Sequence, residues 1–338
     1  MKQLVLGIET SCDETAASVV ADGREVLSNV IASQIDLHRL YGGVVPEIAS
    51  RKHVEAIIPV IDRAMQEANV TYEDLSAIAV TQGPGLVGSL LVGLSAAKAL
   101  AYAKRIPLIG VNHIEGHIYA NFLAHRAVEP PLVCLTVSGG HTDLLHIPAV
   151  GSYTVLGRTR DDAAGEAFDK VGRVLGLPYP AGPQIDALAV RGDPNAYPLP
   201  RALAEGLDFS FSGLKTAAIN MLHNLRQRGE EIDIADFAAS LQEAIVDVLV
   251  AKTMQAATEL DVSVIIMSGG VAANTRLRTK FTELTQQAGI RFFYPPVELC
   301  TDNAAMIASA GYFRWARGER AELDLDAVPG LRLAQRQG

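Results

Sequence analysis

The sequence is poor in cysteine and aromatic residues, and it has no excess of positive charge. Its 338 residues include three cysteines, too few for a disulfide framework or a cysteine-rich zinc module, as is typical of a protein in a reducing compartment. Lysine and arginine number 29 against 38 aspartates and glutamates, a net charge of −9. This balance excludes a protein that coats nucleic acid through bulk charge, but it leaves room for a local basic face or a basic partner.

Long apolar runs are also absent. The longest stretch without a charged residue, 75–97, is broken in its middle by Gly83-Pro84-Gly85, so neither piece is long enough to span a bilayer. The N-terminus has one lysine, a short apolar run and then acidic residues, which does not fit a secretory signal. Because 49% of the residues are hydrophobic, the chain can bury a full core. We therefore expect a cytoplasmic protein that does not use a membrane.

Short β-rich runs that end in turns and lead into helical patterns predict an α/β fold. Strands are expected at 3–9, 15–21, 75–81, 106–112, 132–138, 142–147 and 262–268, and helices at 52–68, 86–103 and 235–260. A strand followed by Ser-Gly-Gly occurs at 137–140 and again at 267–270, which predicts two related αβ lobes. The segment 176–213, rich in proline and glycine, is interpreted as a long ordered loop.

Two histidines four residues apart, His113 and His117, form a candidate metal site. On a helix such a pair shares one face and can bind one ion together with a third ligand from elsewhere. In proteases of the His-Glu-x-x-His type the glutamate is the second residue, whereas Glu115 is the third, which turns its carboxylate by about 100° around the helix. The spacing supports metal ligands and metal-free surface histidines equally, and it disfavours a protease.

Two acidic stretches could supply further ligands. A small-residue helix begins after 300–303, where Thr301 or Asp302 would make an ordinary N-cap, and Asp302 could also be the carboxylate that the two histidines need. Asp162, Glu166 and Asp169 have helical spacing and would share one face. Such a face is usually solvated, but one of these carboxylates could bind ribose hydroxyls.

Several glycine turns are candidates for holding a nucleotide. The segment 83–88 matches G-x-G-x-x-G, but no acidic residue ends the next strand, so close strand–helix packing is favoured over an anion at the helix N-terminus. The two Ser-Gly-Gly turns, with the 9–15 turn that contains Asp13, could bring backbone N–H groups to phosphates. Ordinary hairpin turns are the alternative, yet the repetition favours a nucleotide between two lobes.

Taken together, the order and spacing of these motifs resemble the bacterial TsaD family of tRNA threonylcarbamoyladenosine transferases, formerly described as sialoglycoprotein endopeptidases. The resemblance runs from about residue 4 to 312 and rests on nine linked motifs. They are Gly7–Thr15, Gly42–Glu47, Gly83–Leu86, His113 with His117, Val137–Thr142, Asp161–Lys170, Asp208–Thr216, Gly269–Asn274 and Cys300–Asn303.

The resemblance implies an actin/Hsp70/sugar-kinase-like (ASKHA) fold, two αβ lobes around a nucleotide cleft. We expect the lobes at 1–125 and 126–325 and a tail at 326–338, and it is open whether the helix from about 302 returns to the first lobe. The implied activity transfers the threonylcarbamoyl group of threonylcarbamoyl-AMP to the exocyclic N6 amine of the adenosine 3′ to the anticodon, in tRNAs that read ANN codons.

The resemblance also implies site residues. One divalent metal ion, iron or zinc, would be held by His113, His117 and Asp302. No catalytic residue is identified, although Asp13 or Glu14 is a candidate to relay a proton from the amine. The residues implied to bind the adenylate are Thr136, Val137, Ser138, Gly139, Gly140, Asp169, Gly182, Asp186 and Asn274.

The implied partners are tRNA as substrate, a paralogous TsaB subunit and a TsaE ATPase. ATP or ADP could use the same cleft, and the chain alone could form a homodimer. Local basic contacts with tRNA are expected from Arg51-Lys52, Arg173 or the segment 276–280, each of which could equally be solvated surface. A zinc metalloprotease, a small-molecule kinase of the same fold and a non-enzymatic partner subunit are the alternative functions.

Overall fold

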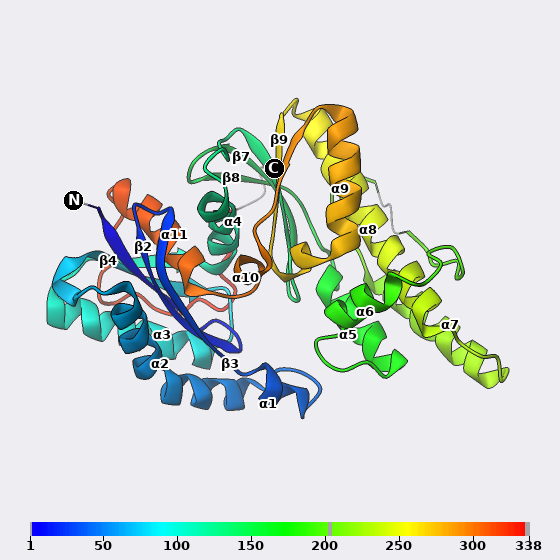
Figure 1. Ribbon diagram of the computed structural model, residues 1–338, viewed down its shortest axis with the longest axis horizontal. Helices are drawn as coiled ribbons and strands as arrows, with labels where there is room; N and C mark the ends of the chain where they lie inside the picture. Colours follow the sequence, from blue (N-terminus) through cyan, green and yellow to red (C-terminus); the bar gives the residue numbers. More distant parts are fainter. Residues whose placement is uncertain (1, 202–204, 335–338) are drawn as a thin grey trace. The chain divides into compact units, whose positions relative to one another are not determined.

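The computed structural model describes residues 2–201 and 205–334, and these form two compact units (Figure 1). The first lies within Met1–Val128 and Pro295–Gln335, and the second within Glu129–Tyr294. How these units correspond to functional lobes stays a prediction, and residues 335–338 of the expected tail lie outside the described residues. Within the described ranges, no helix is both long enough and apolar enough to cross a bilayer.

The first unit is built on a five-stranded sheet in the order β3-β2-β1-β4-β5. Strand β1 pairs antiparallel with β2 and parallel with β4, which is in turn parallel to β5. Helices α2 and α3 pack on one face of this sheet and α4 and α11 on the other, so β1 and β2 are almost entirely buried (Figure 1). The elements are β1 (Leu4–Glu9), β2 (Glu14–Ala21), β3 (Glu25–Ser33), α1 (Ile35–Arg39), α2 (Pro46–Ala68), η1 (Tyr72–Asp74), β4 (Leu75–Gly83), α3 (Val87–Lys104), β5 (Leu108–Asn112), α4 (His113–Ala124), α10 (Val297–Cys300) and α11 (Ala304–Ala316).

The second unit repeats this strand pattern. Its sheet has the order β10-β9-β6-β7-β8, in which the first strand, β6, again pairs antiparallel with the next strand and parallel with β9. The two sheets therefore share one topology, as the repeated sequence pattern predicts. The elements are β6 (Leu132–Val137), β7 (Thr142–Ala149), β8 (Ser152–Arg158), α5 (Ala164–Leu175), α6 (Ala181–Ala189), α7 (Ser212–Gln227), α8 (Ile234–Glu259), β9 (Val264–Ser268), η2 (Gly270–Ala273), α9 (Thr275–Ala288) and β10 (Arg291–Phe293).

The expected strands and helices are all present within a few residues, but the interpretation of 176–213 as a loop was wrong in part. Helix α6 lies inside that segment. Its sequence begins Ala-Gly-Pro, which locally favours a turn. The carboxylate of Asp169, on the preceding helix α5, accepts a hydrogen bond from Ala181 N at 2.8 Å and so satisfies one N–H group in the first turn of α6. A cap of this kind leaves no local sequence signal.

The C-terminal strap, residues 321–331, runs beside the sheet of the first unit without forming a strand or helix of its own. Ala321 N donates to Leu108 O at 2.8 Å, on the edge strand β5, and Val328 N donates to Gln82 O at 2.9 Å. The strap therefore satisfies part of an open sheet edge, which would otherwise be a template for pairing with another chain.

Candidate metal centre and nucleotide turns

His113 and His117 lie in the first two turns of α4. The side chain of Asn112 caps this helix, because its Oδ1 accepts hydrogen bonds from Ile114 N at 2.8 Å and Glu115 N at 3.3 Å. The cap fixes the start of α4 directly after β5. The two imidazoles share one helix face, as expected, with ring centroids 4.7 Å apart, and both side chains are buried.

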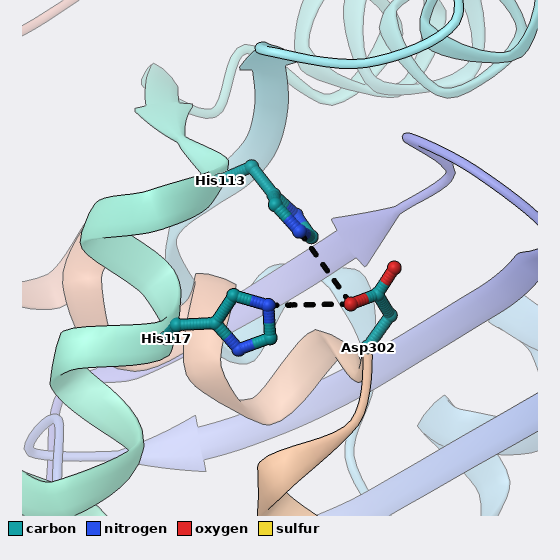
Figure 2. Close-up of side chains that lie close together, drawn as sticks. All are labelled: His113, His117 and Asp302. Atoms are coloured by element: carbon teal, nitrogen blue, oxygen red, sulfur yellow. Dashed lines mark ion pairs between the residues drawn. The ribbon is translucent and has the colours of Figure 1, made fainter. Parts of the chain in front are cut away.

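Asp302 faces both imidazoles from the segment before α11 (Figure 2). Its Oδ1 lies 3.3 Å from Nε2 of His117 and 3.5 Å from Nε2 of His113, and the three candidate ligand atoms all lie within 4.8 Å of one another. The expectation that Thr301 or Asp302 caps the helix was wrong. Asn303 is the N-cap, and its Oδ1 accepts from Met306 N at 3.0 Å. The carboxylate of Asp302 is therefore left to face the histidines.

The other side of the His113 ring is held by the end of β1. Glu9, which is fully buried, places Oε2 3.1 Å from Nδ1 of His113, and the same oxygen accepts from Thr81 Oγ1 at 2.6 Å. The hydroxyl of Ser11 also lies 3.1 Å from that Nδ1. Because Glu9 and Ser11 lie at Nδ1, Nε2 is the nitrogen that faces the carboxylate of Asp302 and would bind a metal ion in place of a proton.

The two carboxylates in this cluster favour positive charge between them. Burial lowers the pKa of His113, but Asp302 and Glu9 outweigh burial and hold that pKa well above its usual value. Burial likewise raises the pKa of Asp302, and the two histidines outweigh it and keep the pKa far below its usual value. Burial lowers the pKa of His117, which keeps that ring neutral and able to act as a ligand. Two imidazole nitrogens and one carboxylate oxygen fit a divalent ion such as zinc or iron.

Glu115 is turned away from the two histidines. Its carboxylate is buried and lies 3.0 Å from Nη1 of Arg314 on α11. This is the position that its place in the motif predicts, since the third residue of the five points to another side of the helix. A protease would need this carboxylate beside the metal as a general base, and Arg314 holds it elsewhere.

The residues expected to bind the adenylate all belong to the second unit. Thr136 and Val137 end β6, and Ser138, Gly139 and Gly140 form the turn into β7. The hydroxyl of Thr136 lies 3.0 Å from that of Ser268, so the ends of β6 and β9 are tied together. A Cβ at Gly269 would meet Val137 O at 2.4 Å, which brings the two Ser-Gly-Gly turns into contact.

Open space lies next to this pair of turns. A Cβ at Gly139, at Gly140 or at Gly182 would meet no atom within 4 Å among the described residues. Backbone at Gly139 and Gly140 is therefore accessible to a ligand, and its N–H groups are the kind that bind phosphate, whereas the N–H of Gly182 is hydrogen-bonded to Asp169.

The remaining predicted contacts carry structural hydrogen bonds. Asp169 caps α6, as described above, and Asp186 accepts from the hydroxyl of Thr275 at 2.8 Å. Asn274 caps α9 by accepting from Leu277 N at 2.9 Å, and its Nδ2 donates to Gln242 Oε1 at 2.6 Å. These side chains fix the ends of α6 and α9, and their contact with a ligand stays a prediction.

The proposed acidic face of α5 does not exist as expected. The helix begins at Ala164, so Asp162 precedes it and cannot share a face with Glu166 and Asp169. Asp162 is ion-paired with Lys170 at 2.9 Å and with Lys215 at 2.5 Å. These pairs use its carboxylate within the protein, and a role for it in binding ribose is not supported.

The G-x-G-x-x-G segment is occupied by protein atoms, as the packing interpretation predicts. A Cβ at Gly83 would meet Val328 O at 2.0 Å, one at Gly85 would meet Ser11 O at 2.6 Å, and one at Gly88 would meet Ser50 Oγ at 2.4 Å. The glycines allow close approach of neighbouring segments, and no room is left there for a dinucleotide.

The expected basic segment 276–280 is largely engaged inside the second unit. Arg276 makes a two-point ion pair with Glu243, at 2.7 and 2.9 Å, and Lys280 pairs with Glu243 and Asp247. The guanidinium of Arg278 lies 4.4 Å from the ring centroid of Tyr294. These contacts weaken the expectation that the segment is a tRNA contact.

Sequence reasoning missed the supports of the histidines. Glu9 contacts His113, Thr81 contacts Glu9, and Asn112 caps α4. Of these three residues, only Glu9 had a signal in the sequence, because an acidic residue at the end of a buried strand is unusual. Thr81 comes from a different strand, and its contact with Glu9 depends on the pairing of β1 with β4.

A family model described as TsaD, tRNA N6-adenosine threonylcarbamoyltransferase, matches residues 25–309 of this chain. A protein of that name from Symbiobacterium thermophilum is 61% identical over 331 residues, which covers 98% of this chain and 97% of the relative. Its counterpart in Bacillus subtilis is 58% identical over 336 residues, covering 98% and 96%.

Solved structures resemble this chain in fold. HypF from T. kodakarensis superposes with a TM-score of 0.63 at 15% identity, over 94% of this chain and 48% of that chain. A ROK hexokinase from Thermus thermophilus superposes with a TM-score of 0.51 at 16% identity, over 94% and 100%. Together with the two sheets of equal topology, these likenesses confirm the expected fold class, and at such low identity they show the fold alone.

Proposed function

We propose, for a chain that belongs to the TsaD family of tRNA N6-adenosine threonylcarbamoyltransferases, that His113, His117 and Asp302 form its metal centre and that the glycine turns of the second unit bind its acyl-adenylate substrate. The family membership confirms the resemblance seen in the nine motifs. It also confirms the expected activity, a transferase that modifies adenosine in tRNA, over a metalloprotease or a small-molecule kinase.

The chemistry explains why the acyl donor must be activated. An exocyclic adenine amine is a poor nucleophile, whereas a mixed carbamoyl–phosphate anhydride is a reactive acyl donor with AMP as its leaving group. A zinc or iron ion at this site would supply Lewis acidity to a substrate carbonyl. Glu9 orients the ring of His113 through Nδ1, so that Nε2 of that ring is presented beside Asp302.

The turn at 138–140 is the proposed seat of the adenylate phosphate. Its support is the open space beside Gly139 and Gly140, where backbone N–H groups can approach a phosphate oxygen. Donors held in place by the fold stabilise the charge that develops on a departing phosphate without having to reorganise. Thr136, Val137, Asp169, Gly182, Asp186 and Asn274 complete the proposed binding set, and ATP or ADP would use the same turns.

Glu14 is the better-supported candidate for the group that accepts the proton of the amine. Its Oε1 accepts from Ser33 Oγ at 2.8 Å, whereas its buried Oε2 has no hydrogen-bond partner among the described residues. Burial raises the pKa of Glu14 to about 8, close to the pH at which the enzyme would work, which suits a general base. Burial also raises the pKa of Asp13. If Glu14→Gln and Asp13→Asn both kept the full transfer rate, neither residue would have this role.

The partner TsaB is proposed to dock on an apolar surface formed by α2 and α3. Val54 and Ile58 on α2 are 63% and 56% exposed, and Val87 and Leu91 on α3 are 55% and 44% exposed. The two helices pack against each other, and pairs of exposed large apolar side chains one turn apart are characteristic of interaction sites. The competing occupant is a second copy of this chain, and the TsaE ATPase would join the heterodimer.

Replacing an apolar side chain on this surface tests the docking. Ile58→Glu should abolish co-purification with TsaB, because it places a charge in the proposed contact. Tyr102→Glu is the control, since Tyr102 is 75% exposed near the other end of α3. Equal loss of co-purification in both variants, or in neither, would contradict the assignment of this surface to TsaB.

We also infer that the chain works in the cytoplasm, where its tRNA substrate is found.

The convergence of His113, His117 and Asp302 carries the metal proposal, because it brings three candidate ligand atoms within 4.8 Å of one another. Metal analysis of His113→Ala tests it, and unchanged occupancy would refute it.

The activity is tested by mass spectrometry of tRNA nucleosides after the protein is depleted. Threonylcarbamoyladenosine should fall and should return with the wild-type gene but not with Asp302→Ala. Normal levels after depletion would refute the activity.

A further inference from the structure

The C-terminal strap contacts the metal-bearing helix through Asn112. Nδ2 of Asn112 donates to Leu331 O at 3.2 Å, while Oδ1 of the same side chain caps α4. One side chain therefore joins the strap to the first turn of the helix that carries His113 and His117. A shift of the strap would change the position of this cap and of both imidazoles.

A second line of contacts joins the strap to the other side of His113. Gly85 N donates to Pro329 O at 3.1 Å, and Leu86 N donates to Ser11 O at 2.8 Å. The hydroxyl of Ser11 lies 3.1 Å from Nδ1 of His113. Gly83, whose φ is 154°, is required here, because a Cβ would meet Val328 O at 2.0 Å.

We propose that the C-terminal strap braces the metal centre and that Asn112 is the positioning residue that transmits its docking to α4. The inference rests on the proposed function, since it assumes that the histidines bind a metal. Metal ligands must lie within about 0.2 Å of their preferred distances, so small movements of α4 affect the affinity. By linkage, metal binding stabilises the docked strap as much as the docked strap strengthens metal binding.

A purely protective role for the strap predicts something different. If the strap only covered the edge of β5, through the pair Ala321–Leu108, loosening it at Asn112 would expose the sheet edge and leave the metal centre unchanged. The contact at Leu331 leads to His113 through Asn112, and the contact at Pro329 leads to it through the segment 85–86 and Ser11. An edge cover requires neither contact.

Asn112→Asp separates the two roles of Asn112. It keeps an oxygen to accept from Ile114 N and Glu115 N, and it removes the donor to Leu331 O. The matched control is Gln82→Glu, which introduces the same charge change and removes the Nε2 donor to Asp326 O on the strap, at 3.2 Å. No hydrogen bond joins Gln82 to the cap of α4 in the described residues, so the control removes the strap contact at Asp326 and leaves in place those at Pro329 and Leu331, which lead to His113.

The full chain is titrated with Co²⁺ alone, and the visible absorption of the bound ion reports the ligand geometry. We expect Asn112→Asp to lower the Co²⁺ affinity roughly 10-fold to 100-fold, the range typical of partners that orient ligands, and to alter the spectrum. Gln82→Glu should keep the wild-type spectrum. Hydrogen exchange of 321–331 should slow when Co²⁺ binds the wild-type chain.

If Asn112→Asp left the Co²⁺ affinity and the spectrum unchanged, the proposal that the strap braces the metal centre would be wrong. It would also be wrong if Co²⁺ did not change the rate of hydrogen exchange in 321–331. An equal loss of affinity in Gln82→Glu would overturn the role of Asn112. If the wild-type chain bound no Co²⁺, the proposed metal site itself would fail, and this outcome is distinct from the other two.

Discussion

The two units share one sheet topology but carry different chemistry at equivalent turns. After its first strand the first unit has the turn 9–15, with Glu9, Asp13 and Glu14, and after its first strand the second unit has Ser138, Gly139 and Gly140. The first turn carries the buried carboxyl groups of Glu9 and Glu14, and the second offers accessible backbone. Metal binding at the first unit should therefore be sensitive to the removal of a side-chain group, and adenylate binding at the second unit should be sensitive to added bulk.

The largest expected effect is the loss of the Asp302 charge. Asp302→Asn keeps the size of the side chain but removes the carboxylate that faces both Nε2 atoms, and we expect metal affinity to fall by more than about 100-fold, with no detectable transfer. Isothermal titration with Zn²⁺ and a transfer assay measure the two effects. Glu115→Gln is the matched control, because that buried carboxylate pairs with Arg314 and should leave metal binding intact. If Asp302→Asn kept the Zn²⁺ affinity of the wild type, the proposed dependence of the metal site on this carboxylate would be wrong.

Adding bulk to the open turn should weaken the substrate and spare the metal. Gly139→Val has room for its side chain in the free protein, so the fold should be preserved, but the side chain would occupy space proposed for the adenylate. We expect the Kd of a non-hydrolysable adenylate analogue to rise about tenfold, roughly 1.4 kcal/mol. Gly213→Val, at the start of α7 and equally open, is the control. If both variants bound the adenylate analogue with the same Kd, the turn at 138–140 would not be part of the adenylate site.

The buried carboxyl of Glu14 should make stability depend on pH in a specific direction. Because its folded pKa is raised from 4.5 to about 8, its contribution to folding is complete below about pH 4.5 and is lost as the pH rises towards 8. Glu14→Gln should therefore gain stability relative to the wild type between pH 5 and pH 8, on the order of a few kcal/mol. Urea unfolding at both pH values measures this change. Parallel pH profiles would show that Glu14 is not neutral in the folded protein.

The smallest expected effect is at the cap of α11. Asn303→Ala removes the acceptor for Met306 N and the donor to Thr301 O, and it should lower the free energy of unfolding by about 1 kcal/mol. Because Asp302 is the preceding residue, we also expect a modest loss of metal affinity. Thermal unfolding with and without Zn²⁺ separates the two. If Asn303→Ala were less stable than the wild type without Zn²⁺ but equally stable with it, the ion rather than the cap would position this segment.

Local pattern predicted the strands, the helix of His113 and His117 and the direction of Glu115, because these depend on periodicity within one element. The interpretation failed where a tertiary contact satisfied a local need. Asp169 caps α6 from another helix, and Asn303 rather than its neighbours caps α11. Three adjacent polar residues at 301–303 gave no basis for choosing among them, and the choice decides which side chain faces the histidines.

The first unit is interrupted in the sequence by the whole of the second, and this has a consequence for synthesis on the ribosome. His113 and His117 are made before the second unit, whereas Asp302, Asn303 and the strap residues are made after it. The compact unit Glu129–Tyr294 is therefore complete while the first sheet still lacks α11, which packs on all five of its strands. Ribosome-bound or truncated chains that end before residue 302 therefore lack one of the three proposed ligands, so metal loading would require synthesis to continue past the second unit.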